Sequence, residues 1–217
     1  MNKNSWNLRR LIILALIAAL SFIAVAFIRI PAVMFLKYEP KDVLLAIGGF
    51  MFGPIAGFCV ATLVALLELV TVSDTGVIGM LMNIVSSGLF VCTASYVYQR
   101  KRTLFGAVSG LVLGVLFTTG GMLLWNYLIT PLYMGMPREA VAELLLPVFL
   151  PFNLLKGGLN AALVMLLYKP VTQALRSARL LPPADLNKGK TRLSIWMASL
   201  FVALSLVLLL LSWSGMI

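Results

Sequence analysis

The sequence VLLAIGGFMFGPIAGFCVATLVALL occupies residues 43–67 and carries no charged side chain. It is long enough for one membrane-spanning helix, because about 20 apolar residues cross the hydrocarbon core of a bilayer. It also contains Gly48, Gly49 and, near its centre, Gly53 followed by Pro54. A proline disfavours helical backbone in the residue before it, so the stretch can equally form two short helices. Whether one or two helices form here determines the direction in which every later segment crosses the membrane.

The distribution of basic residues favours two helices. The other apolar segments are residues 11–28, 77–98, 104–129, 141–168 and 193–213. With two helices in residues 43–73, seven spans result, and 12 of the 17 Lys and Arg residues fall in loops on the side of the N-terminus. Four fall on the other side, and a single helix would invert this ratio. Because basic loops face the cytoplasm, the sequence predicts seven spans and a cytoplasmic N-terminus. The basic residues assigned to outer loops are Arg29, Lys37, Lys41 and Arg138.

The composition is that of a membrane protein. Hydrophobic residues make up 61% of the chain and charged residues 11%, against about 25% charged residues in soluble domains. The absence of histidine excludes Ser-His-Asp triads and histidine-bound metals. The two cysteines lie in apolar segments and form no metal-binding motif. The net charge of +10 reflects cytoplasmic loops, so we expect no nucleic-acid partner.

Polar side chains within the apolar segments lie at a similar depth. Glu68, Asn83 and Asn126 lie near the outer ends of their segments, and Asn153 and Lys156 near the outer start of theirs. Each alone also fits snorkelling or a bond between helices. Together they predict an outward-facing pocket for a neutral, flat molecule with polar edges. Aromatic residues near this level, which an interfacial belt would also explain, are Phe35, Tyr38, Trp125, Tyr127, Tyr133 and Phe152.

Small residues form two seams along the apolar segments. Ala15 and Ala19 are four residues apart on the first segment, and Gly106, Gly110 and Gly114 repeat this spacing on another. Such seams let helices approach closely. The glycine seam is expected to pack internally, whereas the alanine seam could face either a helix of this chain or another subunit. A signal peptide is the rival interpretation of the first segment, but its apolar run is longer than usual for one.

The chain shows no energy source of its own. It lacks a GxxxxGK[ST] loop, and no inverted repeat of broken helices is evident. We therefore expect a substrate-binding subunit whose energy comes from another protein, and we expect no cofactor. The expected organisation is a six-helix membrane core in residues 1–175, a basic cytoplasmic linker in 176–192 and an appended transmembrane helix in 193–217.

Five motifs carry a resemblance to a known family. They are FLKYEPKD at residues 35–42, FGPIAG at 52–57, TGVIG at 75–79 with Asn83, WNYLITPLY at 125–133 and PFNLLKG at 151–157. On these motifs the chain resembles the substrate-binding S components of energy-coupling factor (ECF) transporters, most closely the riboflavin-specific branch.

This resemblance implies an all-α, six-helix protein of a prokaryotic cell membrane that binds riboflavin from outside. It implies two kinds of partner, a transmembrane coupling subunit and two cytoplasmic ATPases. Positions matching Asn126, Asn153 and Lys156 bind the flavin in that branch, and the first loop near Leu36 and Tyr38 covers it. The resemblance also implies that Ala15 and Ala19 contact the coupling subunit.

Other functions are weighed against this one. A member of the same family could bind a different vitamin or a purine-like compound, and a retained yellow chromophore would separate these cases. A membrane enzyme is disfavoured because the chain has neither histidine nor a paired-carboxylate site. An assembly factor without a ligand is disfavoured by the shared depth of Glu68, Asn83, Asn126, Asn153 and Lys156.

Overall fold

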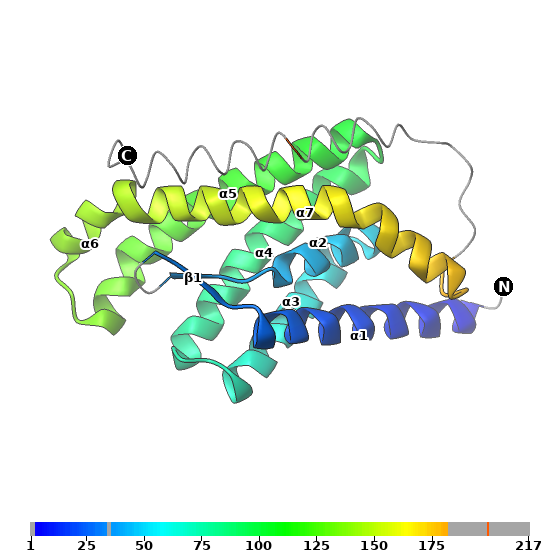
Figure 1. Ribbon diagram of the computed structural model, residues 1–217, viewed down its shortest axis with the longest axis horizontal. Helices are drawn as coiled ribbons and strands as arrows, with labels where there is room; N and C mark the ends of the chain where they lie inside the picture. Colours follow the sequence, from blue (N-terminus) through cyan, green and yellow to red (C-terminus); the bar gives the residue numbers. More distant parts are fainter. Residues whose placement is uncertain (1–2, 34–35, 182–198, 200–217) are drawn as a thin grey trace.

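The chain forms a helical bundle with one small hairpin, shown by a computed structural model that describes residues 3–33, 36–181 and 199 (Figure 1). The long helices are α1 (Lys3–Phe27), α3 (Pro54–Thr71), α4 (Gly76–Arg100), α5 (Leu104–Met134) and α7 (Leu150–Ser177). The shorter elements are α2 (Lys41–Phe52), α6 (Arg138–Leu144), the π-helix η1 (Leu145–Phe149) and strands β1 (Ile30–Val33) and β2 (Leu36–Tyr38). The expected linker and appended helix lie almost wholly outside the described residues.

Residues 43–73 form two helices, as the charge distribution predicts. The break falls at Gly53, whose φ of +96° is a conformation that favours glycine, and Pro54 then begins α3. The first of the two helices, α2, has 12 residues and is about 18 Å long, which is shorter than the hydrocarbon core. It is largely buried and packs against α1, α3, α4 and α7. The expected second span is therefore a short central helix.

Five helical segments in the described chain are long and apolar enough to cross a membrane. They lie in α1, α3, α4, α5 and the continuous run Arg138–Ser177, which joins α6, η1 and α7. The side chains that these helices expose are largely apolar, for example Leu116 and Phe117 on α5. Such surfaces suit a lipid environment, so the fold is a polytopic membrane bundle.

The glycine seam of α5 packs internally, as predicted. A Cβ added to Gly110 would lie 2.7 Å from the carbonyl oxygen of Ala94, and one added to Gly114 would lie 3.0 Å from that of Phe90. Both carbonyls belong to α4, so the absence of side chains lets α4 and α5 approach closely.

The alanine seam of α1 faces outward. Ile13, Ile17 and Ala18 are buried against the bundle, whereas Ala15 and Ala19 are exposed. The seam is therefore available to lipid or to another subunit and is not used for packing within the described chain.

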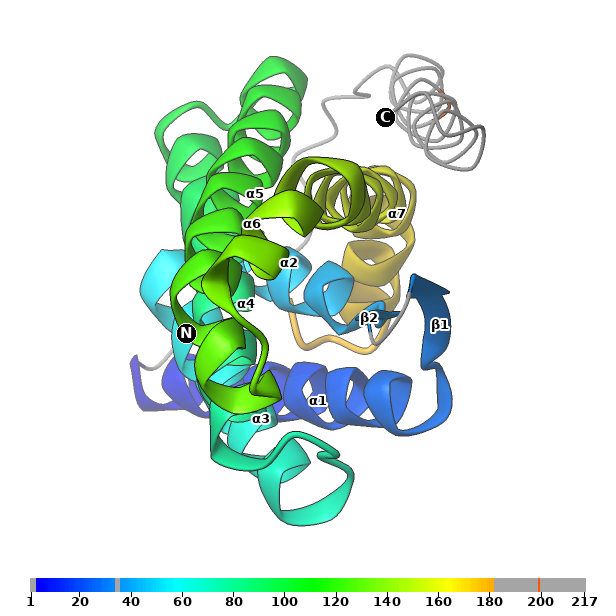
Figure 2. The same ribbon diagram turned by 90° about the vertical axis from the view of Figure 1, so that its left-hand side faces the viewer.

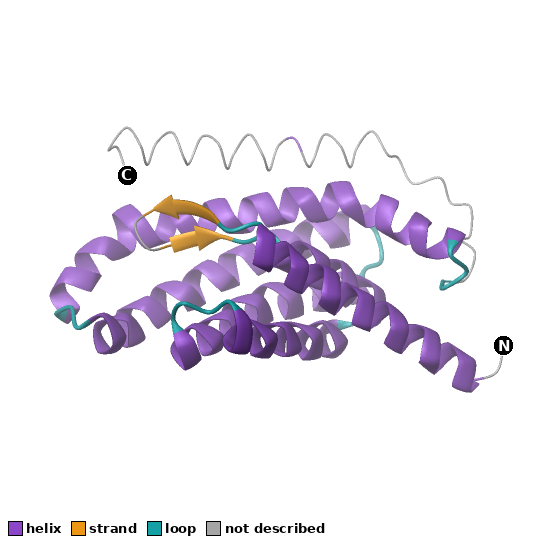
Figure 3. Cartoon of the chain, turned by 60° about the horizontal axis from the view of Figure 1, so that its bottom comes forward, coloured by secondary structure: helices purple, strands orange, loops and turns teal. Residues whose placement is uncertain are grey.

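A β-hairpin between α1 and α2 was not predicted by the sequence analysis. Strands β1 and β2 pair antiparallel, with Ile30 opposite Tyr38 and Pro31 opposite Lys37, and the register shifts between Pro31 and Val33 (Figure 3). The hairpin lies near α6 at one end of the bundle, and α1 begins at the other (Figures 1 and 2). This arrangement places the hairpin beside the helix ends that carry the predicted polar residues, such as Glu68, Asn83 and Asn153.

Candidate functional site

A cavity of about 290 Å³ lies beside the hairpin. This is close to the lower end of the size range of small-molecule sites. Its walls come from the hairpin, α3, the connection between α3 and α4, and from α4, α5 and α7. The predicted site residues that line it are Leu36, Glu68, Asn83, Asn153 and Lys156. The structure thus places these five predicted binding residues around one cavity.

The two other predicted binding residues lie behind this wall. Among the described residues that line the cavity, neither Tyr38 nor Asn126 occurs. The Tyr38 hydroxyl donates to Oδ1 of Asn160 at 3.0 Å. Asn126 is buried, donates to the carbonyl oxygen of Met122 at 2.7 Å and accepts from the Thr130 hydroxyl at 3.0 Å. Its link to the site is Met122, which lines the cavity one turn earlier on α5.

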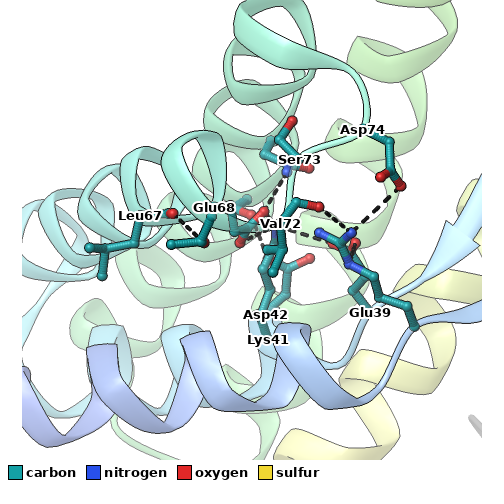
Figure 4. Close-up of polar contacts among 12 residues, drawn as sticks. Glu39, Lys41, Asp42, Leu67, Glu68, Val72, Ser73 and Asp74 are labelled. Carbon is teal, nitrogen blue, oxygen red and sulfur yellow. Dashed lines mark hydrogen bonds and ion pairs between the residues drawn. The ribbon is translucent and has the colours of Figure 1, made fainter.

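Glu68 is held by Lys41, which the charge count placed with the outer-loop residues and which the structure shows as the buried first residue of α2. Lys41 is only 1% exposed, and its Nζ donates to both carboxylate oxygens of Glu68 at 2.7 Å. Asn83 also donates to Glu68, at 2.7 Å. Lys41, rather than Lys156, is the lysine paired with Glu68. Figure 4 shows Lys41 and Glu68 side by side, where α2 meets α3.

Asp42 is a second buried carboxylate near the cavity. Its Oδ1 accepts from the Ser87 hydroxyl at 2.5 Å. Its Oδ2 lies 3.8 Å from Nζ of Lys156. The carboxylate of Asp42, on α2, therefore balances the charge of Lys156. The Lys156 side chain lines the cavity and is 14% exposed.

Ion pairs also fasten the hairpin region to the connection between α3 and α4. Lys37 donates to Asp74 at 2.7 Å. Arg29 donates to the carbonyl oxygen of Val72 at 2.6 Å and lies 3.3 Å from Glu39 (Figure 4). Burial alone would raise the pKa of the Glu39 carboxyl, but the cations of Lys41, Lys156 and Arg29 outweigh it and hold the pKa below its ordinary value. Glu39 is therefore ionised at neutral pH.

The charges at the site balance. Each of four cations has a carboxylate within 4 Å, at distances of 3.3, 2.7, 2.7 and 3.8 Å. These pairs are Arg29–Glu39, Lys37–Asp74, Lys41–Glu68 and Lys156–Asp42, and two further contacts link Arg29 to Asp74 at 3.7 Å and Lys41 to Glu39 at 3.2 Å. A buried charge without a partner is costly, so a site whose own charges cancel favours a neutral ligand over an ionic one.

Apolar and amide groups complete the cavity. Phe152 and Tyr133, both from the predicted aromatic set, line it. Asn153 donates through Nδ2 to the carbonyl oxygen of Phe149 at 2.8 Å, which leaves Oδ1 as an acceptor. Donor and acceptor groups therefore lie beside apolar walls, an arrangement typical of sites for small organic molecules.

Sequence reasoning missed Arg29, Lys37, Glu39, Lys41 and Asp42 as parts of the site. All five lie between α1 and the first turn of α2, in a stretch where charges of both signs alternate between apolar segments. That alternation was the available signal, because opposite charges so close together can pair with one another when buried.

The fold and the cavity define a polytopic helical membrane protein that holds a small molecule at one end of its bundle. Sequence comparison gives the family. The chain belongs to the substrate-specific components of ECF transporters, because the sequence model of that family matches residues 9–168. It is thus a transporter component rather than an enzyme, and members of this family work with an ECF module.

Individual relatives agree with the family. The chain is 31% identical to the riboflavin transporter RibU of Streptococcus thermophilus, over 78% of this chain and 85% of that protein. It is 27% identical to RibU of Staphylococcus aureus, over 77% and 93% of the two chains. The riboflavin transporter FmnP of Bacillus subtilis is 25% identical over 80% of this chain and 99% of that protein.

A solved structure shares the fold. It is described as the S component of a bacterial ECF transporter and superposes with a TM-score of 0.67 at 28% identity. The similarity covers 78% of this chain and 99% of that one. It confirms the expected all-α membrane fold.

Proposed function

We propose that this protein binds riboflavin in the cavity beside the hairpin and delivers it through an ECF module. The observation that carries the proposal is that three relatives, each aligned over at least 77% of this chain, are named riboflavin transporters. The cavity supports it physically, because its paired charges suit a neutral ligand and its walls suit a flat ring.

The chemistry of riboflavin matches the groups available. The isoalloxazine ring carries carbonyl oxygens along one edge and an N–H group between them. Lys156 can donate to such an oxygen, and Oδ1 of Asn153 can accept from the N–H. Phe152 and Leu36 supply apolar surface for the ring. We assign the remaining predicted residues to the frame of the site: Glu68 and Asn83 in its wall, and Tyr38 and Asn126 behind it.

Flavin fluorescence tests this function. Purified protein in detergent, stripped of co-purified ligand, should quench micromolar riboflavin with a stoichiometry of one. A wild-type protein that does not quench would refute the flavin assignment. An absorption spectrum of the protein before stripping would then show whether another chromophore had been bound.

We further propose the composition of the assembly and its orientation. The partners are a transmembrane coupling subunit and two cytoplasmic ATPases, and the coupling subunit contacts the outward-facing seam of Ala15 and Ala19. The protein lies in the cell membrane of a prokaryote, with its N-terminus in the cytoplasm and the cavity open to the outside. The support for this orientation is the bias of 12 basic residues to 4 in the predicted loops.

The domain organisation is also proposed. Residues 1–175 form the binding core, 176–192 a basic linker and 193–217 an appended transmembrane helix. The family model ends at residue 168, within α7, which supports a core that does not need the last segment.

A further inference from the structure

Asp42 joins three helices from the first turn of α2. It is 2% exposed, and its carboxylate can only accept hydrogen bonds. Oδ1 accepts from Ser87 on α4 at 2.5 Å. Oδ2 faces α7, where it lies 3.5 Å from Nδ2 of Asn160 and 3.8 Å from Nζ of Lys156. One buried carboxylate thus contacts both a side chain that lines the cavity and a neighbour on the same helix face.

Asn160 extends this contact to the hairpin. Because Asp42 needs a donor, the amide presents Nδ2 to it and keeps Oδ1 for another donor. That donor is the Tyr38 hydroxyl, at 3.0 Å. Burial raises the pKa of this hydroxyl, which therefore stays protonated. Tyr38 lies on β2, two residues after Leu36, a lining residue of the cavity. A chain of contacts thus runs from the hairpin to Lys156.

On the assumption that the proposed flavin binding is correct, we propose that Asp42 is a positioning residue for the ligand. It fixes Asn160 as the acceptor that holds the hairpin beside the cavity, and it places the ammonium group of Lys156. In the described structure Asp42 does not itself line the cavity, so it acts through these two residues.

The outer fastening of β2 is weaker than this inner one. The ion pair between Lys37 and Asp74 has side chains that are 41% and 67% exposed. Exposed ion pairs contribute little, because solvent screens them and ordering long side chains opposes them. The Tyr38–Asn160–Asp42 contacts are largely buried, so they should dominate the rate at which β2 leaves the ligand.

The test compares association and dissociation rates of riboflavin by stopped-flow fluorescence. Tyr38→Phe removes only the hydroxyl, and Asp42→Asn removes the charge at constant size. Each should raise koff on the order of tenfold and change kon much less. The double variant should release ligand no faster than Asp42→Asn alone, because both substitutions break one chain of contacts.

Ser87→Ala is the matched control. It removes a contact of Asp42 with α4 but leaves both contacts with α7, so koff should stay close to the wild-type value. A merely structural Asp42 would instead give similar defects in Ser87→Ala and Asp42→Asn. Asp42→Glu keeps the charge and should retain the ligand longer than Asp42→Asn. If Asp42→Asn does not fold, the comparison is made with Asp42→Glu.

Two further results would overturn the inference. One is an unchanged koff in Tyr38→Phe, a variant that removes a single hydroxyl and leaves the fold intact. The other is a double variant whose effects multiply. Failure of the proposed function looks different, because wild-type protein would then show no binding of riboflavin at all.

Discussion

Lys41 and Glu68 form a buried ion pair beside the cavity, with Nζ 2.7 Å from both carboxylate oxygens and each side chain 2% exposed, and this Nζ also lies 3.2 Å from Glu39. They tie the start of α2 to the end of α3. Asn83 adds a bond from α4, so three helices meet at one carboxylate. The pair therefore fixes the shape of the cavity as well as its charge.

Breaking this pair should destabilise the protein strongly. Glu68→Leu leaves Lys41 buried with less compensation, and Lys41→Met leaves Glu68 without its cation, so each should cost about 3–5 kcal/mol. The double variant Lys41→Met/Glu68→Leu should recover much of that loss, because it leaves no lone charge of the pair. Thermal unfolding in detergent measures all three, with the exposed Lys101→Met as the control. Additive losses in the double variant would show that the two charges act independently.

Lys156 should contribute directly to ligand affinity. Losing a hydrogen bond to a charged group costs about 1.5–3 kcal/mol, or roughly ten- to 150-fold in Kd. Lys156→Ala should therefore weaken riboflavin binding at least about tenfold. Asn153→Ala should weaken it less, because Nδ2 of Asn153 already donates to Phe149. Fluorescence titration measures both, with Lys101→Ala as a matched lysine control. Equal affinities in wild type and Lys156→Ala would remove Lys156 from the ligand contacts.

The sequence predicts the polar residues near the outer ends of the long helices, because polar side chains are rare in segments that cross a bilayer. Glu68, Asn83, Asn153 and Lys156 stand out against apolar neighbours, and their shared depth places them at one level. The same reasoning does not find Lys41 and Asp42. Their burial depends on contacts with residues far along the chain, such as Ser87, which is 45 positions from Asp42.

The fold shows a similar division. The break at Gly53 follows from local backbone preferences, so it is predictable. The hairpin is not, because strands of four and three residues are too short to show a periodic pattern. The contact of Tyr38 with Asn160 joins positions 122 residues apart and exists only once α7 packs beside the hairpin.

The orientation can be tested by cysteine labelling. In a background without Cys59 and Cys92, a single cysteine at Lys101 should resist an impermeant reagent in whole cells. A cysteine at Glu139 should react, because α6 lies at the opposite end of the bundle (Figure 1). Both positions are exposed, so burial does not explain a difference. Labelling at Lys101 but not at Glu139 would show that the orientation is the opposite of the proposed one.

The last segment should be dispensable for binding. Leu180 and Leu181 pack against the hydrophobic core, so the truncation belongs after Leu181. The shortened protein should bind riboflavin with an affinity close to that of the full chain, since the described cavity is built from earlier residues. Fluorescence titration of both forms measures this. A folded truncated protein with a loss beyond about tenfold, or 1.4 kcal/mol, would place the last segment in the binding core.

Enlarging the alanine seam should separate transport from binding. Ala15 and Ala19 are exposed on α1, and small side chains there let another helix approach closely. Ala15→Trp and Ala19→Trp should therefore abolish most uptake of riboflavin in cells. The purified variants should bind riboflavin as the wild type does, because neither residue lines the described cavity.

Two controls give this experiment its meaning. Ala15→Ser keeps the side chain small and should still support transport. Leu20→Trp adds an indole at another exposed position of α1, about 140° around the helix from Ala15, and should be tolerated if the seam alone meets the partner. If Leu20→Trp blocks uptake as completely as Ala15→Trp, the coupling contact is a broad face of α1. If both alanine variants transport normally, the seam faces lipid and the coupling subunit binds elsewhere on the bundle.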